Sequence, residues 1–429
     1  MKLRTLLLLL IAVCCIGVNA FATTYYVATN GSDSNPGTSA QPWATLQHAA
    51  DTMQPGDTTL IRTGTYLGFR AETPGQSGAP ITMAADAGAT VAVNAAGPIN
   101  RHTSNIEVEN YDLTVQYWVI DGIESYNSLK YGVDVRTASH ITVQNCWTHN
   151  NASTGIFSAF SDYETIQYNE TNNNGEHGIY HSNSADYPTI RGNNSHNNYA
   201  CGIHMNGDKS MGGDGQISYA LVEQNVIWDN GAGGGGSGIN CDGVSDSVFR
   251  NNLLYLNHAS GISLYSIDGT FGSSRDKVYN NTIVFPVSTE GRHCINIPKS
   301  SGKYSPVGNL VKNNVLYTAN TSKCSIWMYG TAALASGGSD YNACVDRFCK
   351  DGKRTITLAT WQGAGFDTHS FLATPAQLFV DPANNNFHLK SGSLAANTGT
   401  NLSPDVTNDF DGESRPQGSA YDIGCFEDW

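Results

Sequence analysis

The sequence predicts an all-β fold in which short strands wind into a parallel β-helix, a solenoid. The prediction depends on a recurring asparagine, a ladder of Gly-Ile and Gly-Val pairs, and a lack of helical periodicity through the middle of the 429-residue chain. Asn closes a short β-rich run at spacings of 24, 24, 32, 27, 29 and 33 residues, at positions Asn145, Asn169, Asn193, Asn225, Asn252, Asn281 and Asn314. This period suits a solenoid coil and is too short for a propeller blade of about 40 residues.

The asparagines are expected to stack along the solenoid axis. Successive coils lie about 4.8 Å apart, so equivalent residues fall on top of one another. Side-chain amides can then hydrogen-bond from coil to coil, which gives the asparagines a structural role. A glycine before Ile or Val lies about ten residues after these positions, at Gly132, Gly155, Gly178, Gly202, Gly238 and Gly261. We expect each glycine to make the turn into a strand and the Ile or Val to point inward.

Both ends of a solenoid need a cover. Residues 43–54 predict an amphipathic helix, with Leu46, Ala49, Ala50 and Met53 on one face, that caps the N-terminal end. The repeat fades after about residue 330. We therefore expect a β-helix domain over residues 23–330 and a loop-rich C-terminal cap over residues 331–429.

The first 22 residues predict a secretory signal peptide. Lys2 and Arg4 precede an apolar run, and Ala20-Phe21-Ala22 offers small residues at a cleavage site. We expect a secreted, periplasmic or cell-surface protein that has no membrane contact after cleavage.

Cleavage would remove Cys14 and Cys15 and leave eight of the ten cysteines. Some of these are expected to pair in an oxidising compartment. Cys344 and Cys349 are close enough for a local disulfide, and Cys294 and Cys324 could link neighbouring coils.

Composition excludes several classes of protein. A net charge of -14 disfavours nucleic acid as a partner, since phosphate binding needs a basic surface. A mean hydropathy of -0.30 excludes a multi-span membrane protein. We expect a monomer.

Several segments resemble secreted bacterial right-handed parallel β-helix proteins, including the family 9 pectate lyases. YYVATNGSDSNPGTSAQPWATLQHAADTMQPGDTTLIRTGTY resembles their opening, whereas ATPAQLFVDPANNNFHLKSGSLAANTGT and DFDGESRPQGSAYDIGCFE resemble their closing segments. INCDGVSDSVFRNNLLYLNHASGISLYSIDG is similar to uncharacterised members. The resemblance implies a right-handed β-helix and an extracellular carbohydrate-active protein, most often a polysaccharide lyase. The sequence lacks the run of clustered aspartates that forms the calcium site of the family 9 lyases. Only Asp242, Gly243 and Asp246 resemble part of that run.

Side chains alternate along a strand, so the residues that follow each inward Ile or Val can be sorted into outward rows. The first row is Asp134, Phe157, Tyr180, His204, Asn240, Ser263 and Asn296. The second row is Arg136, Ala159, Ser182, Asn206, Asp242, Tyr265 and Pro298. The middle coils predict a polar, acid-bearing patch flanked by insertions at 209–216, 266–276 and 298–308, where a binding groove is usually built.

The resemblance to lyases of acidic polysaccharides implies β-elimination. In that chemistry Ca²⁺ or a cationic side chain neutralises the substrate carboxylate, and a base removes the adjacent proton. Ca²⁺ prefers six to eight oxygen ligands, for which Asp208, Asn240 and Asp242 are candidates. The candidate catalytic residues are Lys209, His204 and Arg275, and the candidate substrate-binding residues are Tyr180, Asn206, Tyr265 and Arg292.

Two other functions remain open. A glycoside hydrolase would use two carboxylates, such as Asp242 with Asp268 or Asp208. A glycan-binding or cell-surface module would need no catalytic groups, and the scarcity of Lys and Arg in the outward rows favours it.

Overall fold

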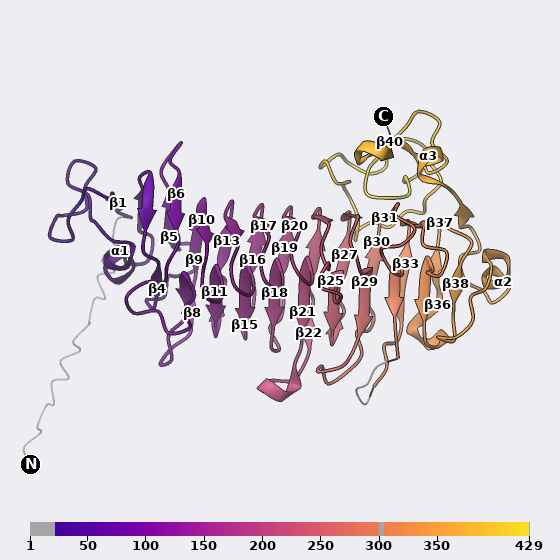
Figure 1. The fold of residues 1–429 in the computed structure, drawn as a ribbon, viewed down its shortest axis with the longest axis horizontal. Helices are drawn as coiled ribbons and strands as arrows, with labels where there is room; N and C mark the ends of the chain where they lie inside the picture. Colours follow the sequence, from indigo (N-terminus) through magenta and orange to yellow (C-terminus); the bar gives the residue numbers. More distant parts are fainter. Residues whose placement is uncertain (1–21, 300–303, 429) are drawn as a thin grey trace, which may run out of the picture.

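Three parallel sheets wind around one axis in the computed structural model, which describes residues 22–299 and 304–428 (Figure 1). We name them sheets A, B and C. Sheet A holds β1 (Thr24–Val27), β2 (Thr58–Ile61), β5 (Ile81–Ala85), β9 (Trp118–Asp121), β13 (Thr142–Gln144), β16 (Thr165–Gln167), β19 (Thr189–Arg191), β23 (Leu221–Glu223), β27 (Val248–Arg250), β30 (Lys277–Tyr279), β33 (Asn309–Lys312) and β36 (Leu334–Asp340).

Sheets B and C complete each coil. Sheet B holds β3 (Gly64–Tyr66), β6 (Val91–Val93), β10 (Ile123–Tyr126), β14 (Trp147–His149), β17 (Glu170–Asn172), β20 (Asn194–His196), β24 (Val226–Trp228), β28 (Leu253–Tyr255), β31 (Thr282–Phe285), β34 (Val315–Thr318), β37 (Ala343–Cys344) and β39 (Phe371–Leu372). Sheet C holds β4 (Phe69–Ala71), β7 (Ile106–Val108), β11 (Val133–Arg136), β15 (Ile156–Ala159), β18 (Ile179–Ser182), β21 (Ile203–Asn206), β25 (Ser237–Asp242), β29 (Ser260–Tyr265), β32 (Ile295–Ile297), β35 (Ile326–Met328) and β38 (Phe348–Cys349). The predicted parallel β-helix is confirmed.

Shorter strands and helices lie between or outside the three sheets. Two-residue strands pair between sheets C and A as β8 (Val115–Gln116) with β12 (Ala138–Ser139) and β22 (Ile217–Ser218) with β26 (Val244–Ser245), and β40 (Phe379–Asp381) pairs antiparallel with β41 (Asn386–Leu389). The helices are α1 (Leu46–Thr52), α2 (Leu358–Gln362), α3 (Pro375–Leu378) and the 3-10 turns η1 (Lys209–Met211), η2 (Thr331–Ala333) and η3 (Pro382–Asn384). None of the helices in the described part of the chain has the length and apolar character needed to cross a membrane. The predicted signal peptide lies outside the described residues, apart from Ala22.

An asparagine ladder runs along the coils, as predicted, from Asn169 to Asn314, and the structure extends it to Asn342, which was not predicted. Each side-chain amide donates to the amide oxygen of the next coil over 2.9–3.1 Å, as between Asn225 and Asn252 at 2.9 Å. The prediction is wrong at Asn145, which is exposed and bonds Asp121. Cys146 takes its place and donates its backbone N–H to Asn169.

The glycine ladder has a different physical reason from the predicted turn. None of its six glycines has a positive φ. A Cβ at Gly155 would lie 2.7 Å from the Gly178 carbonyl oxygen, and one at Gly261 would lie 2.5 Å from the Cys294 carbonyl oxygen. Glycine is needed because neighbouring coils approach too closely for a side chain. The Ile and Val residues that follow are fully buried, as predicted.

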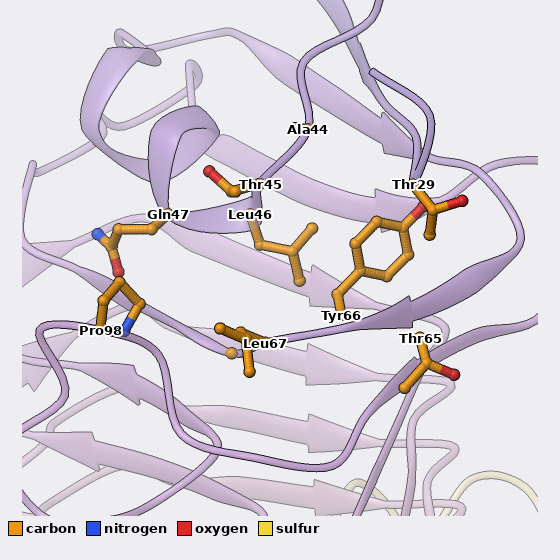
Figure 2. Close-up of a pocket in the computed structure, with 10 residues that line it drawn as sticks. Thr29, Ala44, Thr45, Leu46, Gln47, Thr65, Tyr66, Leu67 and Pro98 are labelled. Carbon is orange, nitrogen blue, oxygen red and sulfur yellow. The ribbon is translucent and has the colours of Figure 1, made fainter. Parts of the chain in front are cut away.

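The N-terminal cap is helix α1. The helix is shorter than the predicted 43–54, and its apolar face is buried as predicted: Leu46 and Ala50 are 1% exposed, and Ala49 and Met53, the residue after the helix, are fully buried. Gln47 fixes the helix to β4 by accepting from the Arg70 N–H at 2.9 Å and donating to the Arg70 carbonyl at 3.0 Å. A hollow of about 250 Å³ lies beside the helix, lined by Thr29, Ala44, Thr45, Leu46, Gln47, Thr65, Tyr66, Leu67, Gly68 and Pro98 (Figure 2). Its lining holds no carboxylate, imidazole or amine, so it offers little chemistry.

The C-terminal part differs from a simple end cap. The sheets continue past residue 330 to β39, and Trp361 and Phe366, which precede β39 in the chain, close the far end of the core. Residues 373–428 then turn back along the outside of the coils (Figure 1). Phe379, Phe387 and Phe426 cover the outer face of sheet B, and a second contact joins Tyr421 to Tyr279 of sheet A.

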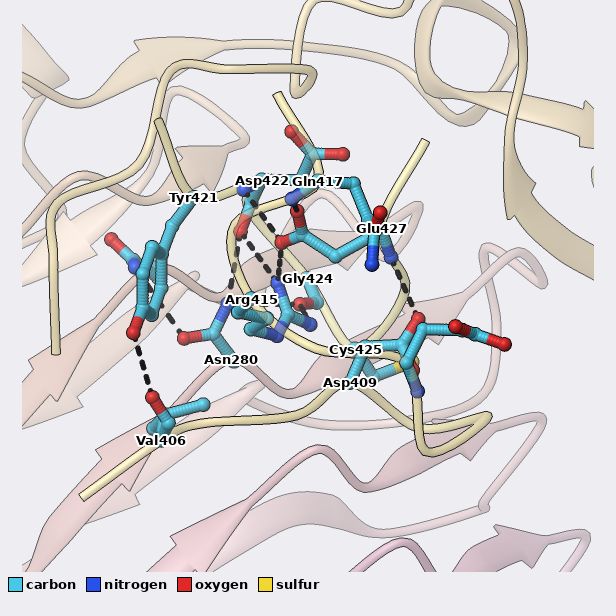
Figure 3. Close-up of polar contacts among 12 residues, drawn as sticks. Asn280, Val406, Asp409, Arg415, Gln417, Tyr421, Asp422, Gly424, Cys425 and Glu427 are labelled. Atoms are coloured by element: carbon cyan, nitrogen blue, oxygen red, sulfur yellow. Dashed lines mark hydrogen bonds and ion pairs between the residues drawn. The ribbon is translucent and has the colours of Figure 1, made fainter. Parts of the chain in front are cut away.

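A buried ion pair fixes this returning segment. Arg415 Nη1 lies 2.5 Å from Glu427 Oε1, and Arg415 also donates to the Gly424 carbonyl at 2.8 Å (Figure 3). Asn280 of the adjacent coil donates to the Asp422 carbonyl at 2.9 Å. The C-terminal segment is therefore hydrogen-bonded to the solenoid wall.

The predicted disulfides are wrong. All eight cysteines of the described chain are free and buried, including Cys294, Cys324, Cys344 and Cys349. Cys146, Cys241, Cys294 and Cys344 belong to the main apolar core, and burial raises the pKa of Cys201 to about 12.

Candidate functional site

The outer face of sheet C holds the predicted rows in register. Tyr180 pairs with His204, His204 with Asn240, and Asn240 with Ser263 in successive strands. The second row aligns Ser182, Asn206, Asp242 and Tyr265 in the same way. Residues far apart in the sequence therefore lie next to one another on the outer face of sheet C.

A hydrogen-bonded chain crosses the coils of β21, β25 and β29. The Asn240 side-chain amide nitrogen lies 2.9 Å from His204 Nδ1 and 2.6 Å from the Tyr265 hydroxyl. His204 and Asn240 are almost buried, whereas Tyr265 is partly exposed. The structure therefore brings three of the predicted residues into direct contact.

Tyr180 and Asn206 extend this chain. The Asn206 amide donates to the Tyr180 hydroxyl at 3.3 Å and to Asp268 Oδ2 at 3.4 Å. The Tyr180 and His204 rings lie 4.6 Å apart. We call His204, Asn240, Tyr265, Tyr180 and Asn206 the sheet C cluster.

Burial controls the ionisation of the cluster. Desolvation lowers the pKa of His204 well below its ordinary value of 6.5, with a smaller contribution from His177. Desolvation, with the nearby Asp242 charge, raises the pKa of Tyr265 far above its ordinary range. Desolvation also raises the pKa of Tyr180 to about 12. The cluster is consequently neutral at pH 7 and rich in hydrogen-bond donors.

His177 was not predicted and belongs beside the cluster. Its ring stacks on His204 with centroids 4.8 Å apart, and burial lowers its pKa to about 4. His177 Nδ1 accepts from the backbone N–H of Cys201 at 3.1 Å, so a neutral His177 carries its proton on Nε2. The only sequence signal was its place directly before Gly178 of the glycine ladder.

The Asp242 carboxylate is hydrogen-bonded to backbone N–H groups of a loop. Its Oδ1 accepts from the backbone N–H groups of Ile267 at 2.9 Å and Gly269 at 3.0 Å, and its Oδ2 accepts from Asp268 at 3.0 Å. It is 2% exposed. The carboxylate thus fixes the start of the 266–276 insertion.

The predicted calcium ligands do not fit that ion. Asp242 uses both oxygens for backbone N–H groups, and the Asn240 amide serves His204 and Tyr265. Asp208 Oδ1 accepts from the backbone N–H of Ser210 at 3.0 Å and also from its hydroxyl. Over residues 22–299 and 304–428 no group of three or more His, Cys, Asp and Glu is placed to hold a metal. We therefore derive no step through calcium, and Asp242 is also a poor member of a hydrolase carboxylate pair.

The predicted basic residues lie outside the cluster. Lys209 Nζ donates to the Gly213 carbonyl of its own loop at 2.5 Å. Arg275 forms a two-point ion pair with Asp246 at 2.7 and 2.6 Å. Arg292 reaches the Gly234 carbonyl at 3.3 Å. The structure therefore assigns these three cations to loop contacts.

Comparison with known proteins identifies the family. The model described as "Pel9A-like, right handed beta helix region" matches residues 25–296. The chain belongs to this family. The right-handed sense expected from the sequence resemblance is thereby confirmed, and the chain is a polysaccharide-lyase-like β-helix.

Individual relatives are more distant. Pectate lyase L of Dickeya chrysanthemi is 30% identical over 141 residues, which cover 31% of this chain and 32% of that protein. The uncharacterized protein YwoF of Bacillus subtilis (strain 168) is 44% identical over 59 residues, 14% of this chain and 13% of that protein. The chain thus matches about a third or less of the length of these relatives.

Solved structures of similar fold include pectate lyase Pel9A, with a TM-score of 0.59 and 19% identity over 94% of this chain and 96% of that one. A rhamnogalacturonan lyase has a TM-score of 0.52 and 17% identity over 68% of this chain and 82% of that one. At these identities the similarity concerns the fold.

Proposed function

We propose that the protein is a secreted polysaccharide lyase that cleaves a uronate-containing polysaccharide by β-elimination on the outer face of sheet C. The observation that carries this proposal is the hydrogen-bonded chain of His204, Asn240 and Tyr265. Family membership and the named relative, pectate lyase L, support the substrate class.

Elimination next to a carboxylate requires that negative charge developing on the substrate be stabilised. The amides of Asn206 and Asn240 donate to the hydroxyls of Tyr180 and Tyr265, which leaves the Tyr180 O–H free to bind the uronate carboxylate; the two asparagines hold these hydroxyls in place. Both are nearly buried, so their position is fixed before substrate arrives. The five cluster side chains are neutral, so none of them repels an anionic ligand, although the Asp268 carboxyl accepts from Asn206 at 3.4 Å.

His204 is the proposed base. Its lowered pKa keeps it neutral at pH 7, and a substrate carboxylate beside it would raise its proton affinity. As placed, the Asn240 amide nitrogen donates to His204 Nδ1, so a neutral His204 carries its proton on Nε2. For His204 to act as base, the Asn240 amide must turn over so that its oxygen accepts from Nδ1–H, and Nε2 then takes the proton from C5 of the uronate. The electron pair of that C–H bond forms the C4=C5 double bond, and the bond from C4 to the glycosidic oxygen breaks.

Tyr265 is the proposed acid. Its raised pKa keeps the hydroxyl protonated, so it can transfer a proton to the leaving oxygen. Proton transfer from His204 then restores Tyr265. Lys209 and Arg275 take no part, since both are engaged in loop contacts.

The proposal is tested by incubating the protein with polygalacturonate, alginate, glucuronan and glycosaminoglycans, each with and without a calcium chelator. We expect a new ultraviolet absorbance from the C4=C5 double bond, in step with new reducing ends and unaffected by the chelator. Reducing ends without absorbance would indicate a hydrolase. Binding without either product would indicate a glycan-binding module, and both results would overturn the proposal.

A further inference from the structure

The insertions next to the sheet C cluster enclose a hollow on its flank. The hollow has a volume of about 510 Å³, within the roughly 300–1,000 Å³ of typical ligand pockets. It is lined by Gln216, Ser245, Phe271, Ser274, Arg275, Tyr304, Ser305 and Val307. Figure 1 shows loops projecting from the lower edge of the solenoid, below and to the right of β22 in that view.

Two aromatic rings form one side of the hollow. The Phe271 and Tyr304 rings stack with centroids 4.8 Å apart. Phe271 is 45% exposed and Tyr304 42% exposed, so part of each ring remains open to a ligand. Aromatic surface beside polar groups suits a ligand with both C–H faces and hydroxyls.

Arg275 forms the other side of the hollow, and only some of its N–H groups are hydrogen-bonded. Asp246 engages Nε and Nη2 of Arg275, whereas a guanidinium has five N–H donors. The Arg275 side chain is 57% exposed. Donors therefore remain for a hydroxyl or a carboxylate of a ligand.

The loops that carry these groups are held in place. Gln216 donates to the Phe271 carbonyl at 3.2 Å, and the Thr270 hydroxyl donates to the Asp214 carbonyl at 2.6 Å. A Cβ at Gly272 would lie 2.2 Å from the Pro306 nitrogen, so the two loops touch there. Such a preformed surface loses little entropy when a ligand binds.

The hollow adjoins the sheet C cluster through one residue. The Ser273 hydroxyl donates to the Tyr265 carbonyl at 3.0 Å, and its neighbour Ser274 lines the hollow. We propose that the hollow is a subsite for a sugar ring of the same uronate polysaccharide, remote from the ring that is cleaved. The ring would stack on Phe271 or Tyr304, and Arg275 would bind its hydroxyl or carboxylate groups. This inference rests on the proposed function.

The test uses Phe271→Ala and Tyr304→Ala in the full chain, with Tyr111→Ala as a control because Tyr111 is 64% exposed outside the hollow. Isothermal titration calorimetry measures affinity for long polygalacturonate and alginate chains and for trimers of each. Both variants should lose about ten- to thirtyfold in affinity for the long chain, as expected for an aromatic anchor. Their kcat on the trimer and their thermal midpoints should match the wild type.

The outcomes separate this inference from the proposed function. Unchanged long-chain affinity in both variants, with a wild type that binds and cleaves, would overturn the subsite alone. A wild type that neither binds nor cleaves any uronate polymer would overturn both. An equal loss in Tyr111→Ala would also overturn the subsite, since the effect would not be local.

Discussion

Replacing Asp276 with asparagine should raise the stability of the β-helix at neutral pH. Asp276 is fully buried, and its Oδ1 accepts from the backbone N–H of Ser247 at 3.1 Å, while its Oδ2 has no hydrogen-bond partner. Desolvation raises the pKa of this carboxyl well above its ordinary value of 3.8. The folded chain thus contains an acid that its surroundings do not favour in the charged form.

Asn309, at the same position one coil further on, shows what an amide can do there. Its Oδ1 accepts from the Asp276 N–H at 2.9 Å, and its Nδ2 donates to two backbone carbonyls, of Ser273 at 3.1 Å and Ala333 at 3.0 Å. An Asn at position 276 would keep the acceptor for Ser247 and put an N–H donor, able to bond backbone carbonyls as Asn309 does, where the unpaired oxygen lies. Leaving a buried polar group unsatisfied costs about 1–3 kcal/mol, which is the gain in stability expected at pH 7.

The gain should depend on pH. Because the folded wild type binds this proton more tightly than the unfolded chain, its stability falls as the pH rises from 3.8 toward the raised pKa. Asp276→Asn lacks this loss, so its advantage should be small near pH 4 and largest above the raised pKa.

Thermal unfolding of both proteins between pH 4 and pH 8, followed by circular dichroism, measures this difference. Asp112→Asn is the control, because Asp112 is exposed. A midpoint for Asp276→Asn that equals or falls below the wild type at pH 7 would refute the reasoning, as would a gain that does not change with pH.

Three further predictions concern the ladder, the C-terminal segment and the proposed base. Asn252→Ala should lower the unfolding free energy by about 2–5 kcal/mol, because the Asn252 amide is hydrogen-bonded to Val222, Asn225 and Asn281. The control Asn145→Gly should lower it little. Equal losses of the two variants in urea unfolding would argue against the ladder. Arg415→Met should lower the unfolding free energy by about 3–5 kcal/mol, because Glu427 stays buried without its ion-pair partner. Limited proteolysis should then release residues 373–428 first. Unchanged protection of this segment from the protease would argue against the anchor. The value of kcat/KM should stay constant as the pH falls to 6.5 and decrease only below it, because the base His204 must be neutral and its pKa is lowered. A decrease that begins above pH 6.5 would exclude His204 as the base.

The periodic parts of the fold were predictable because each coil repeats the same environment. The spacing of Asn169, Asn193 and Asn225 gave the ladder, and alternation along the strands gave the outward rows. The error at Asn145 was a shift of one residue. Its neighbour Cys146 holds the ladder position, and a residue type that breaks the repeat leaves no signal in the spacing.

A second asparagine ladder follows sheet B. Asn151, Asn174, Asn198, Asn230 and Asn257 bond in series over 2.9–3.1 Å. Their spacings of 23, 24, 32 and 27 residues are visible in the sequence, but they lie in turns after sheet B rather than after a β-rich run.

The candidate site was predictable only where strands position it. His204, Asn240 and Tyr265 were expected on one wall and are in contact there. Lys209 and Arg275 lie in insertions, where proximity in the sequence does not determine the direction of a side chain. The role of Asp242 was equally hidden, since it depends on backbone N–H groups of a loop 25–27 residues away.

The most direct test of the sheet C site is the initial rate at which Tyr265→Phe forms the unsaturated product, compared with the wild type and Lys209→Ala on the same polymer. Removing the proton donor should lower kcat by about 100- to 10,000-fold, whereas Lys209→Ala should stay within about twofold of the wild type. A Tyr265→Phe protein as fast as the wild type, or a Lys209→Ala protein without activity, would contradict the assignment.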